Sequence, residues 1–238
     1  MKTVLITGGS RGIGRAAVEL FLEKGYKVLF IYRASKQQAE QLEELGAVGY
    51  RADLSLMEEC ARVAELILKE QGGVDVLINN AGISHFSLFT DLKNDEWKRV
   101  CAVNLDAPIY LTRAFLPHMI GQKWGRIVNI SSMWGQVGSS CEVAYSTAKA
   151  GLIGFTKALA KEEGPSGITV NCICPGLIDT DMNEVLDEET IGAIVSETPL
   201  MRVGRPEDVA SCCLYLASKQ ASFITGQIIG VNGGLVIT

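Results

Sequence analysis

The sequence lacks long hydrophobic runs and contains few histidines. No apolar stretch reaches the roughly 18 residues that a membrane-spanning helix needs. The segment from Met1 leads straight into a predicted strand, without the pattern of a usual secretory signal. With only two histidines, His85 and His118, neither a histidine-based metal site nor a Ser-His-Asp triad is expected. We therefore expect a cytoplasmic protein with no membrane anchor and no metal centre.

Cysteine spacing and net charge exclude further classes of function. The seven cysteines follow no zinc-ligand spacing, and most lie in apolar segments such as NCICPG (171–176). We expect them to be buried free thiols in a reducing compartment. The formal net charge of −5 gives no general attraction to nucleic acid or to anionic membranes. The 47% of hydrophobic residues is typical of a folded globular protein.

Short β-branched segments alternate with longer amphipathic segments along the whole chain. This alternation predicts an α/β fold, in which right-handed βαβ units form a parallel sheet that is covered by helices on both faces. We expect one doubly wound domain over residues 1–238, with a mobile substrate flap at about 177–200. The seven predicted strands are residues 2–7, 27–32, 47–52, 74–79, 125–131, 168–174 and 223–231.

A glycine-rich segment, TGGSRGIG (7–14), follows the first predicted strand and precedes the first helix. Gly8 allows a tight turn, Gly12 lets the backbone approach a pyrophosphate, and Gly14 lets the helix pack on the strand. The N-terminus of the helix adds free N–H groups and the positive end of the helix dipole. A glycine loop alone can be an ordinary turn, but its place between strand and helix predicts a dinucleotide site.

The segment after the second predicted strand contains no carboxylate. NAD-binding domains usually place an acidic residue there to hold the ribose hydroxyls, whereas this chain reads YRASK (32–36). Arg33, Ser35 and Lys36 can donate hydrogen bonds to a 2′-phosphate. Arg11, in the glycine loop, is a further candidate. The alternative is a solvated basic start of a helix, and the pattern favours NADP(H) over NAD(H).

Tyr145 and Lys149 lie four residues apart in CEVAYSTAKAG (141–151), a segment made mostly of small residues. On a helix this spacing puts both side chains on one face, about 5–6 Å apart at Cβ. An ammonium near 5 Å stabilises a phenolate by roughly 3 kcal/mol at an effective dielectric constant of about 20. This energy would lower the pKa of the tyrosine by about two units. The pair is therefore predicted to act in acid–base catalysis near physiological pH.

The motifs together resemble those of the short-chain dehydrogenase/reductase family over the whole chain. They are TGGSRGIG (7–14), NNAG (79–82), Asn104, Ser132, YSTAK (145–149) and PG (175–176). The resemblance implies a Rossmann fold and an NADPH-dependent enzyme that reduces a ketone to a secondary alcohol. It further implies that Tyr145 donates the proton and that Lys149 tunes Tyr145 and holds the nicotinamide ribose. Ser132 would bind the carbonyl oxygen, and Asn104 would support a proton relay through water.

The same resemblance implies a set of cofactor contacts. Asp53 would contact the adenine, Asn80 would lie along the cofactor, and Ile178 would contact the carboxamide. The complete set of implied cofactor-binding residues is Gly8, Ser10, Arg11, Gly12, Ile13, Gly14, Arg33, Asp53, Leu54, Asn80, Ala81, Gly82, Tyr145, Lys149, Pro175, Gly176, Ile178 and Thr180.

Within the family, two segments resemble the bacterial 3-oxoacyl-acyl-carrier-protein reductases of fatty acid biosynthesis: PGLIDTDM (175–182) and ITGQIIGVNGG (224–234). This resemblance implies a homotetramer and a substrate presented on acyl carrier protein. Such enzymes often carry two basic residues that dock the acidic carrier. Lys123 matches one of them, but Ser166 stands where the other is expected.

Two other segments of this chain resemble a second subgroup of the family. ISHF (83–86) and SMWGQVGSSCEV (132–143) resemble reductases of a 5-aminopentanone modification on elongation factor P, and Glu142 stands where a neutral residue is common. Glu142 could pair with the amine of such a substrate, or it could be an ordinary solvent-facing acid. The predicted substrate-binding residues are Ser132, Trp134, Glu142 and Tyr145.

Two other functions stay open at this point. The chain could be a catalytically silent dinucleotide-binding protein, although such proteins often lose the tyrosine or the lysine and this chain has both. It could also act physiologically as an alcohol dehydrogenase, because the chemistry is reversible.

Overall fold

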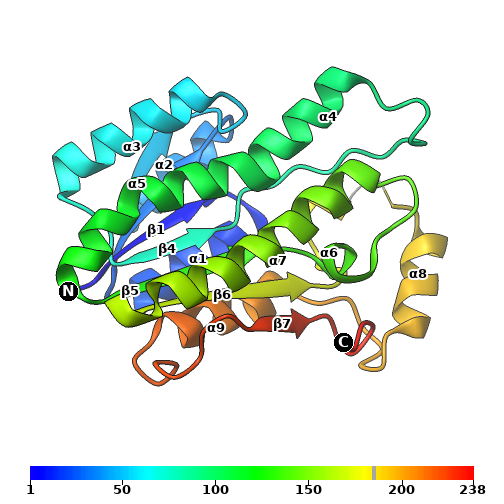
Figure 1. The fold of residues 1–238 in the computed structure, drawn as a ribbon. Coiled ribbons are helices and arrows are strands. Elements are labelled where there is room, and N and C mark those ends of the chain that lie inside the picture. The colour runs from blue at the N-terminus through cyan, green and yellow to red at the C-terminus, as the bar shows by residue number, and fades with distance from the viewer. Residues whose placement is uncertain (184–185) are drawn as a thin grey trace.

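The computed structural model describes residues 1–183 and 186–238, and one parallel sheet runs through it (Figure 1). The strand order is β3-β2-β1-β4-β5-β6-β7, so the direction of winding reverses between β1 and β4. The predicted α/β fold with a seven-stranded parallel sheet is confirmed. The strands are β1 (Thr3–Thr7), β2 (Lys27–Tyr32), β3 (Val48–Arg51), β4 (Val76–Asn79), β5 (Gly125–Ile130), β6 (Ile168–Pro175) and β7 (Ile228–Val231).

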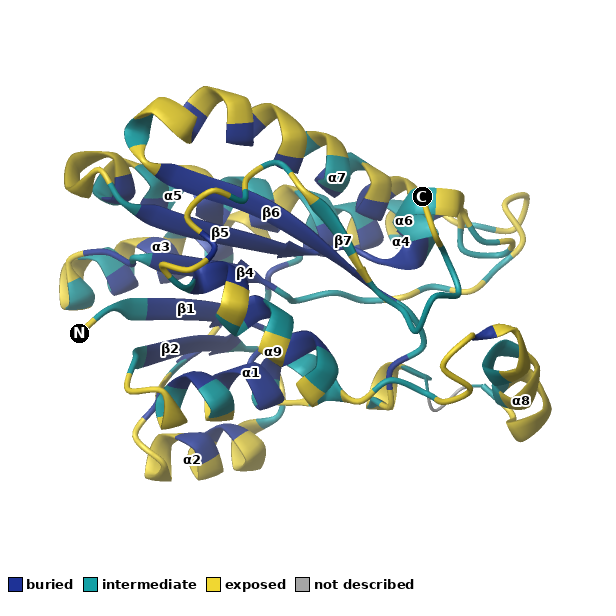
Figure 2. Cartoon of the chain, turned by 90° about the horizontal axis from the view of Figure 1, so that it is seen from below, coloured by how far each residue is buried: buried dark blue, intermediate teal, exposed yellow. Residues whose placement is uncertain are grey.

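Helices cover both faces of the sheet, which explains why its central strands are almost continuously buried (Figure 2). Successive side chains of β1 point to opposite faces: Val4 and Ile6 belong to one core and Leu5 to the other. The first core is closed by α1 (Gly12–Glu23), α2 (Lys36–Glu44) and α9 (Pro206–Ala217). The second is closed by α3 (Met57–Gln71), α5 (Ala107–Gln122) and α7 (Val143–Glu163).

Most of the remaining helices are short and lie near the carboxyl ends of the strands. A π-helix, Ala102–Asp106, joins α4 (Asn94–Cys101) directly to α5, and α6 (Met133–Val137) follows β5. Short 3-10 turns span Gly164–Ser166 and Asp181–Asn183. Helix α8 (Glu188–Glu197) stands apart from the sheet at one end of the molecule (Figure 1).

The segment at 177–200, which we call the flap, contains more regular structure than the sequence led us to expect. Helix α8 lies within it, and its N-cap Asp187 accepts a hydrogen bond from the Thr190 backbone N–H. The start of the flap is bonded to Gly204, whose N–H donates to the Leu177 carbonyl and whose carbonyl accepts from the Asp179 N–H, and at the other end the Leu200 N–H donates to the Gly233 carbonyl. Residues 184–185 of the flap lie outside the described residues, and the predicted mobility of the flap stays a prediction.

The last strand is shorter than predicted. The sequence suggests a strand over 223–231, but β7 begins only at Ile228. The Thr225 side-chain oxygen accepts the hydrogen bond from the Val170 N–H, and Gly226 adopts a positive φ of 71°, so this stretch forms a turn. Phe223 is fully exposed at this turn.

All seven cysteines are free thiols, and four of them are buried. Among the described residues, no group of three or more His, Cys, Asp or Glu side chains is placed to hold a metal ion. In the same part of the chain, no helix is long and apolar enough to cross a membrane.

Candidate active site

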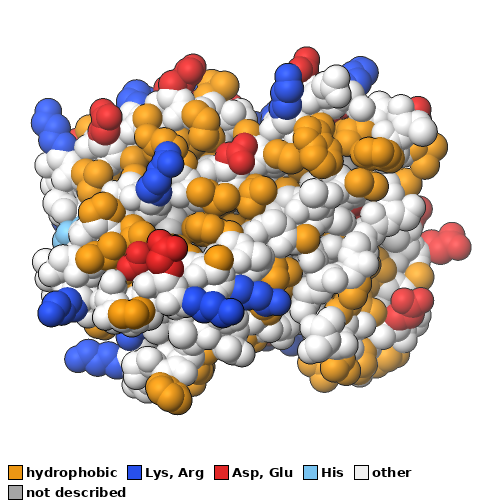
Figure 3. Space-filling view, in the orientation of Figure 1, with side chains coloured by type: hydrophobic (Ala, Val, Ile, Leu, Met, Phe, Trp, Pro, Cys, Tyr) orange, Lys and Arg blue, Asp and Glu red, His pale blue; other side chains and the backbone are white. Residues whose placement is uncertain are grey.

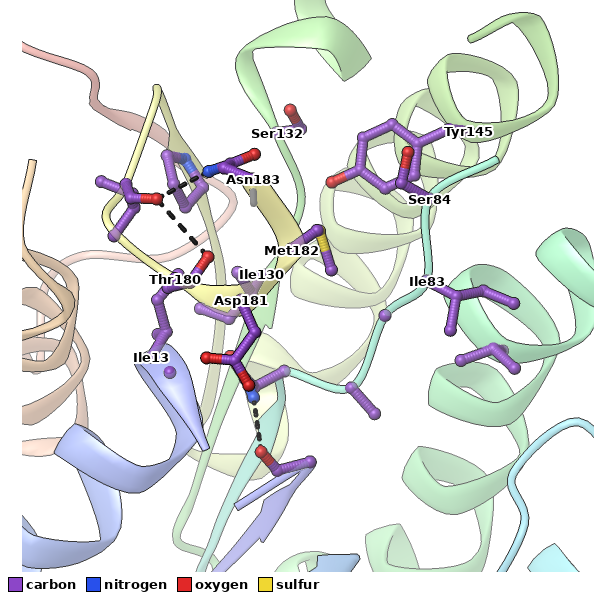
Figure 4. A pocket seen from close by; sticks show the side chains of 18 of the residues that line it. Ile13, Ile83, Ser84, Ile130, Ser132, Tyr145, Thr180, Asp181, Met182 and Asn183 are labelled. Carbon is purple, nitrogen blue, oxygen red and sulfur yellow. Dashed lines mark hydrogen bonds between the residues drawn. The ribbon is translucent and has the colours of Figure 1, made fainter. Parts of the chain in front are cut away.

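A cavity of about 560 Å³ opens at the carboxyl edge of the sheet, next to the point where the strand order reverses. Open α/β sheets bind ligands in this position. The glycine loop, the segments after β4, β5 and β6, helix α7 and the flap all contribute to its walls. Figure 4 shows Ile13 at one end of this cavity and Ser84, Ser132 and Tyr145 at the other.

Most of the predicted site residues lie together in this cavity. Of the catalytic, cofactor-binding and substrate-binding residues implied by the family resemblance, Gly14 and Asn104 do not line it. Those that do are Gly8, Ser10, Arg11, Gly12, Ile13, Arg33, Asp53, Leu54, Asn80, Ala81, Gly82, Ser132, Trp134, Glu142, Tyr145, Lys149, Pro175, Gly176, Ile178 and Thr180.

The glycine loop is packed too tightly for side chains at the predicted positions. A Cβ on Gly14 would lie 2.1 Å from the Gly8 carbonyl oxygen, and Gly8 itself has a φ of 66°. The Thr7 hydroxyl accepts hydrogen bonds from the backbone N–H groups of Asn80 and Ala81, both at 2.9 Å. These bonds tie the end of β1 to the segment after β4. Gly14 therefore supports the loop from behind and does not face the cavity.

The basic residues near the second strand lie in different surroundings. Arg33 lines the cavity, with Nη1 4.0 Å from Oδ2 of Asp53. Lys36 does not line it and instead pairs with Glu40 at 3.4 Å on the surface of α2. Arg11 is 3.4 Å from Asp181 of the flap. Of the candidates for a 2′-phosphate, Arg33 is therefore the best placed.

Asp53 is held in one orientation by the start of the segment that leads into α3. Its Oδ1 accepts hydrogen bonds from the Ser55 backbone N–H at 2.9 Å and from the Ser55 hydroxyl at 2.7 Å. Partial burial raises the pKa of Asp53, but these hydrogen bonds and the charge of Arg33 outweigh it and keep the pKa below its usual value. The carboxylate is thus ionised at neutral pH.

Helix α7 carries both Tyr145 and Lys149, as predicted from their spacing, and both side chains are buried. The Lys149 Nζ donates a hydrogen bond to the Ile130 carbonyl at 2.7 Å and lies 5.7 Å from the centre of the Tyr145 ring. Ser132 is the N-cap of α6, where its Oγ accepts from the Trp134 N–H at 3.1 Å. The strand end of β5 and one face of α7 thus bring the three residues together.

The predicted lowering of the Tyr145 pKa is not found in this structure. Burial raises the pKa of Tyr145 to about 12, an effect that Ser132 opposes and that Glu142 and Cys174 reinforce. Burial also lowers the pKa of Lys149 to about 8. The simple charge argument fails because both groups lose their contact with water and the amine points toward the Ile130 carbonyl. The phenol therefore stays protonated over the physiological range.

Asn104 supports the site from outside the cavity. It is fully buried in the π-helix, and its Nδ2 donates to the carbonyls of Ile83 and Val100 at 2.8 and 2.9 Å. A Cβ on Gly82 would lie 2.8 Å from the Asn104 Oδ1 and 3.4 Å from the Lys149 Nζ. Asn104 thus holds the segment after β4 close to the lysine. The predicted role of Asn104 in a proton relay stays a prediction.

One polar contact in the cavity was not predicted. The Ser84 hydroxyl donates to Glu142 Oε1 at 2.6 Å, which joins the segment after β4 to the N-terminus of α7. Glu142 lines the cavity and is only partly exposed, so its carboxylate faces the site as well as solvent. No local pattern signals this contact, because the partners are 58 positions apart.

The flap adds residues to the cavity that sequence reasoning also missed. Met182 and Asn183 come from its 3-10 turn, and Asn183 donates to the Ile178 carbonyl at 2.6 Å (Figure 4). From α8 and the residues before it, Leu186, Thr190 and Ile194 also line the cavity. Three of these five side chains are apolar, and on α8 the spacing of four residues between Thr190 and Ile194 puts both on one face.

Comparison with known proteins identifies the family of the chain. A family model described as short chain dehydrogenase matches residues 2–191. The chain is 42% identical to the 3-oxoacyl-[acyl-carrier-protein] reductase FabG of Aquifex aeolicus, over 98% of this chain and 97% of that protein. It is 42% identical to the acetoacetyl-CoA reductase of Rhizobium meliloti and 40% identical to the uncharacterized oxidoreductase YmfI of Bacillus subtilis, over 98% of both chains in each pair. The chain therefore belongs to the short-chain dehydrogenase family and is an oxidoreductase.

Proposed function

We propose that this oxidoreductase uses NADPH to reduce the ketone of a 3-oxoacyl thioester carried on acyl carrier protein. The observation that carries the proposal is the meeting of Ser132, Tyr145 and Lys149 in one cavity with the glycine loop. Two relatives, from Aquifex aeolicus and Vibrio cholerae, are named as reductases of this substrate, at 42% and 39% identity.

The residues of the cavity fit a nicotinamide dinucleotide phosphate. The N-terminus of α1 and the loop before it offer backbone N–H groups for the pyrophosphate, and Arg33 offers a guanidinium for the 2′-phosphate. The bare Cα of Gly82 leaves space beside the Lys149 amine, where the nicotinamide ribose would bind. When bound, the cofactor supplies the hydride.

The chain itself supplies the proton. Ser132 and Tyr145 hold the ketone oxygen, and the Tyr145 hydroxyl gives up its proton as negative charge develops there. The raised pKa of Tyr145 keeps this proton in place until the oxygen becomes a strong base. The buried Lys149 ammonium, which burial alone disfavours, then stabilises the phenolate.

Docking of a carrier protein needs a second copy of the chain. Lys123 follows α5 and precedes β5, so it lies at the amino edge of the sheet, opposite the cavity. A carrier that binds Lys123 can therefore reach only the cavity of another subunit. This reasoning supports the expected homotetramer. The face formed by α4, α5 and α7 shows apolar side chains interspersed with both signs of charge (Figure 3).

The test is the rate of NADPH oxidation by the purified protein with a panel of ketones. We expect 3-oxoacyl thioesters to be reduced with the highest kcat/KM, and NADH to support less activity than NADPH. No reduction of any 3-oxoacyl thioester, by a protein that binds NADPH, would contradict the proposal.

A second substrate class is favoured by one contact. The Glu142 carboxylate lines the cavity beside Tyr145, oriented by the Ser84 hydroxyl, and an anion in this place suits a ketone that carries a primary amine. Such a ketone is the 5-aminopentanone modification on elongation factor P. If this is the substrate, Glu142→Gln should raise KM for amine-bearing ketones by roughly 10- to 100-fold, the value of a charge-assisted hydrogen bond.

The control for this experiment is a set of neutral ketones of the same length. They should be reduced equally well by the Glu142→Gln variant, because they make no ion pair. Ser84→Ala removes the hydroxyl but leaves the carboxylate, so it should affect amine-bearing ketones less. Equal effects of Glu142→Gln on charged and neutral ketones would remove the physical argument for an amino-ketone.

A further inference from the structure

Three consecutive residues at the carboxyl end of β5 lie beside the two functional side chains of α7. The Ile130 carbonyl accepts from the Lys149 Nζ at 2.7 Å, and the Ser131 Oγ donates to the Lys149 backbone carbonyl at 2.8 Å. Ser132, next in sequence, lines the cavity together with Tyr145. The lysine is thus fastened to the strand end at both its amine and its backbone.

Besides the Lys149 carbonyl, the Ser131 hydroxyl has the Cys174 thiol of β6 as a neighbour, and Cys172 and Cys174 are the titratable groups that act on Lys149. Ser131 is 3% exposed, and its backbone N–H donates to the Ile173 carbonyl of β6 at 2.8 Å. The Lys149 carbonyl lies inside α7, where a helical partner four residues later already satisfies it. The bond from Ser131 is therefore not needed to satisfy the helix backbone. Its effect is to fix the position of α7 relative to β5 at Lys149.

Helix α6 packs over the hydrogen bond between Ser131 and Lys149 and excludes water from it. A Cβ on Gly135 would lie 2.6 Å from the Ser131 Oγ and 2.9 Å from the Lys149 carbonyl carbon. Only glycine allows α6 to approach so closely. Because water has no room there, the hydrogen bond acts in a low-dielectric environment, where it is stronger than at a surface.

We propose that Ser131 is a positioning residue, which sets the place of the Lys149 amine through the lysine's own backbone. The part of this proposal that concerns the effect of Ser131 on turnover rests on the proposed ketone reduction. The effect of Ser131 on the position of the Lys149 amine does not. Without the bond, α7 can shift relative to β5, and the amine loses its fixed distance to Tyr145 and to the Ile130 carbonyl. The nearby Ser132 hydroxyl stays in place, because it is held by the N-terminus of α6.

The test compares Ser131→Ala with a matched control, Thr156→Val. Thr156 is fully buried two helical turns further along α7, and its hydroxyl accepts from the Asn129 Nδ2 of β5 at 2.9 Å. Thr156→Val thus also removes a buried hydrogen bond between β5 and α7, but away from Lys149. Thermal melts of both variants establish that each is folded.

Two readouts separate positioning from general destabilisation. The first is the titration of lysine side chains by NMR in the free protein, which does not depend on any enzymatic activity. We expect Ser131→Ala to shift the titration of Lys149, because the surroundings of the amine change, and Thr156→Val to leave it unchanged. The second is turnover with NADPH and a reducible ketone, where we expect kcat to fall at least 10-fold for Ser131→Ala and less than 3-fold for Thr156→Val.

The outcomes decide the proposal. A shifted Lys149 titration in Ser131→Ala alone supports it, together with a loss of kcat at nearly constant KM for the ketone. Equal shifts in both variants, or no shift in Ser131→Ala, overturn it. If the wild-type protein reduces no ketone, the proposed function fails, but the NMR comparison still tests whether Ser131 positions Lys149.

Discussion

Replacing Lys149 with methionine should stabilise the protein at neutral pH, even though it removes a residue that turnover needs. The amine is 3% exposed, and burial lowers its pKa from 10.5 to about 8. At about 1.4 kcal/mol per unit, this shift corresponds to roughly 3 kcal/mol of cost for holding the charged form in the folded protein. Methionine has a similar length and needs no charge.

The sign of the pH dependence follows from proton binding. Between pH 8 and 10.5 the unfolded chain holds a proton on Lys149 that the folded chain has released, so the wild type gains stability as pH rises through this window. By pH 9.5 the free energy of unfolding of the wild type has risen by about 2 of these 3 kcal/mol. The lost hydrogen bond to the Ile130 carbonyl costs the variant about 1 kcal/mol at every pH. We therefore expect Lys149→Met to be about 2 kcal/mol more stable at pH 7 and nearly equal to wild type at pH 9.5.

The assay is urea unfolding of wild type and Lys149→Met at pH 7 and pH 9.5, at one protein concentration. Lys161→Met, an exposed position on the same helix, is the control and should show no such change with pH. The reasoning is refuted if the difference in free energy of unfolding between wild type and Lys149→Met is the same at both pH values. Lys149 would then not titrate near pH 8 in the folded protein.

Three further predictions follow from the site. Arg33→Asp should reverse much of the preference for NADPH over NADH, measured as the ratio of the two kcat/KM values, and a wild-type preference for NADH would contradict the assignment of Arg33. Gly14→Ala should abolish NADPH binding in a fluorescence titration and lower Tm, because its Cβ would collide with the Gly8 carbonyl; normal binding would show that the loop is less constrained than described. Lys123→Glu should reduce activity on carrier-bound substrates, with an effect that weakens as salt is added, while activity on a small thioester stays unchanged.

The fold and the centre of the site were predictable because their signals are local. The strands are short β-branched runs, and β2 matches its predicted range of 27–32. The helical spacing of Tyr145 and Lys149 predicted a shared face, and both residues line the cavity. The glycine loop was identified from its position between β1 and α1.

The other features of the site depend on tertiary packing, which no local sequence pattern reveals. The pKa of Tyr145 rises because the surrounding elements exclude water from the phenol. An argument from the charge of Lys149 alone predicted a lowered pKa, which is the wrong direction. The bond from Ser84 to Glu142 joins segments that only the folded sheet brings together. Lys36 was a reasonable phosphate ligand by sequence, but the first turn of α2 directs it to Glu40.

The most direct test of the account is the rate of NADPH oxidation by Tyr145→Phe with a ketone that the wild type reduces. The substitution removes one hydroxyl from a buried ring and leaves the shape of the cavity unchanged. We predict that the variant binds NADPH with wild-type affinity but loses at least 100-fold in kcat, the lower range for a general acid. A kcat within a few-fold of wild type would contradict the assignment of Tyr145 as the proton donor.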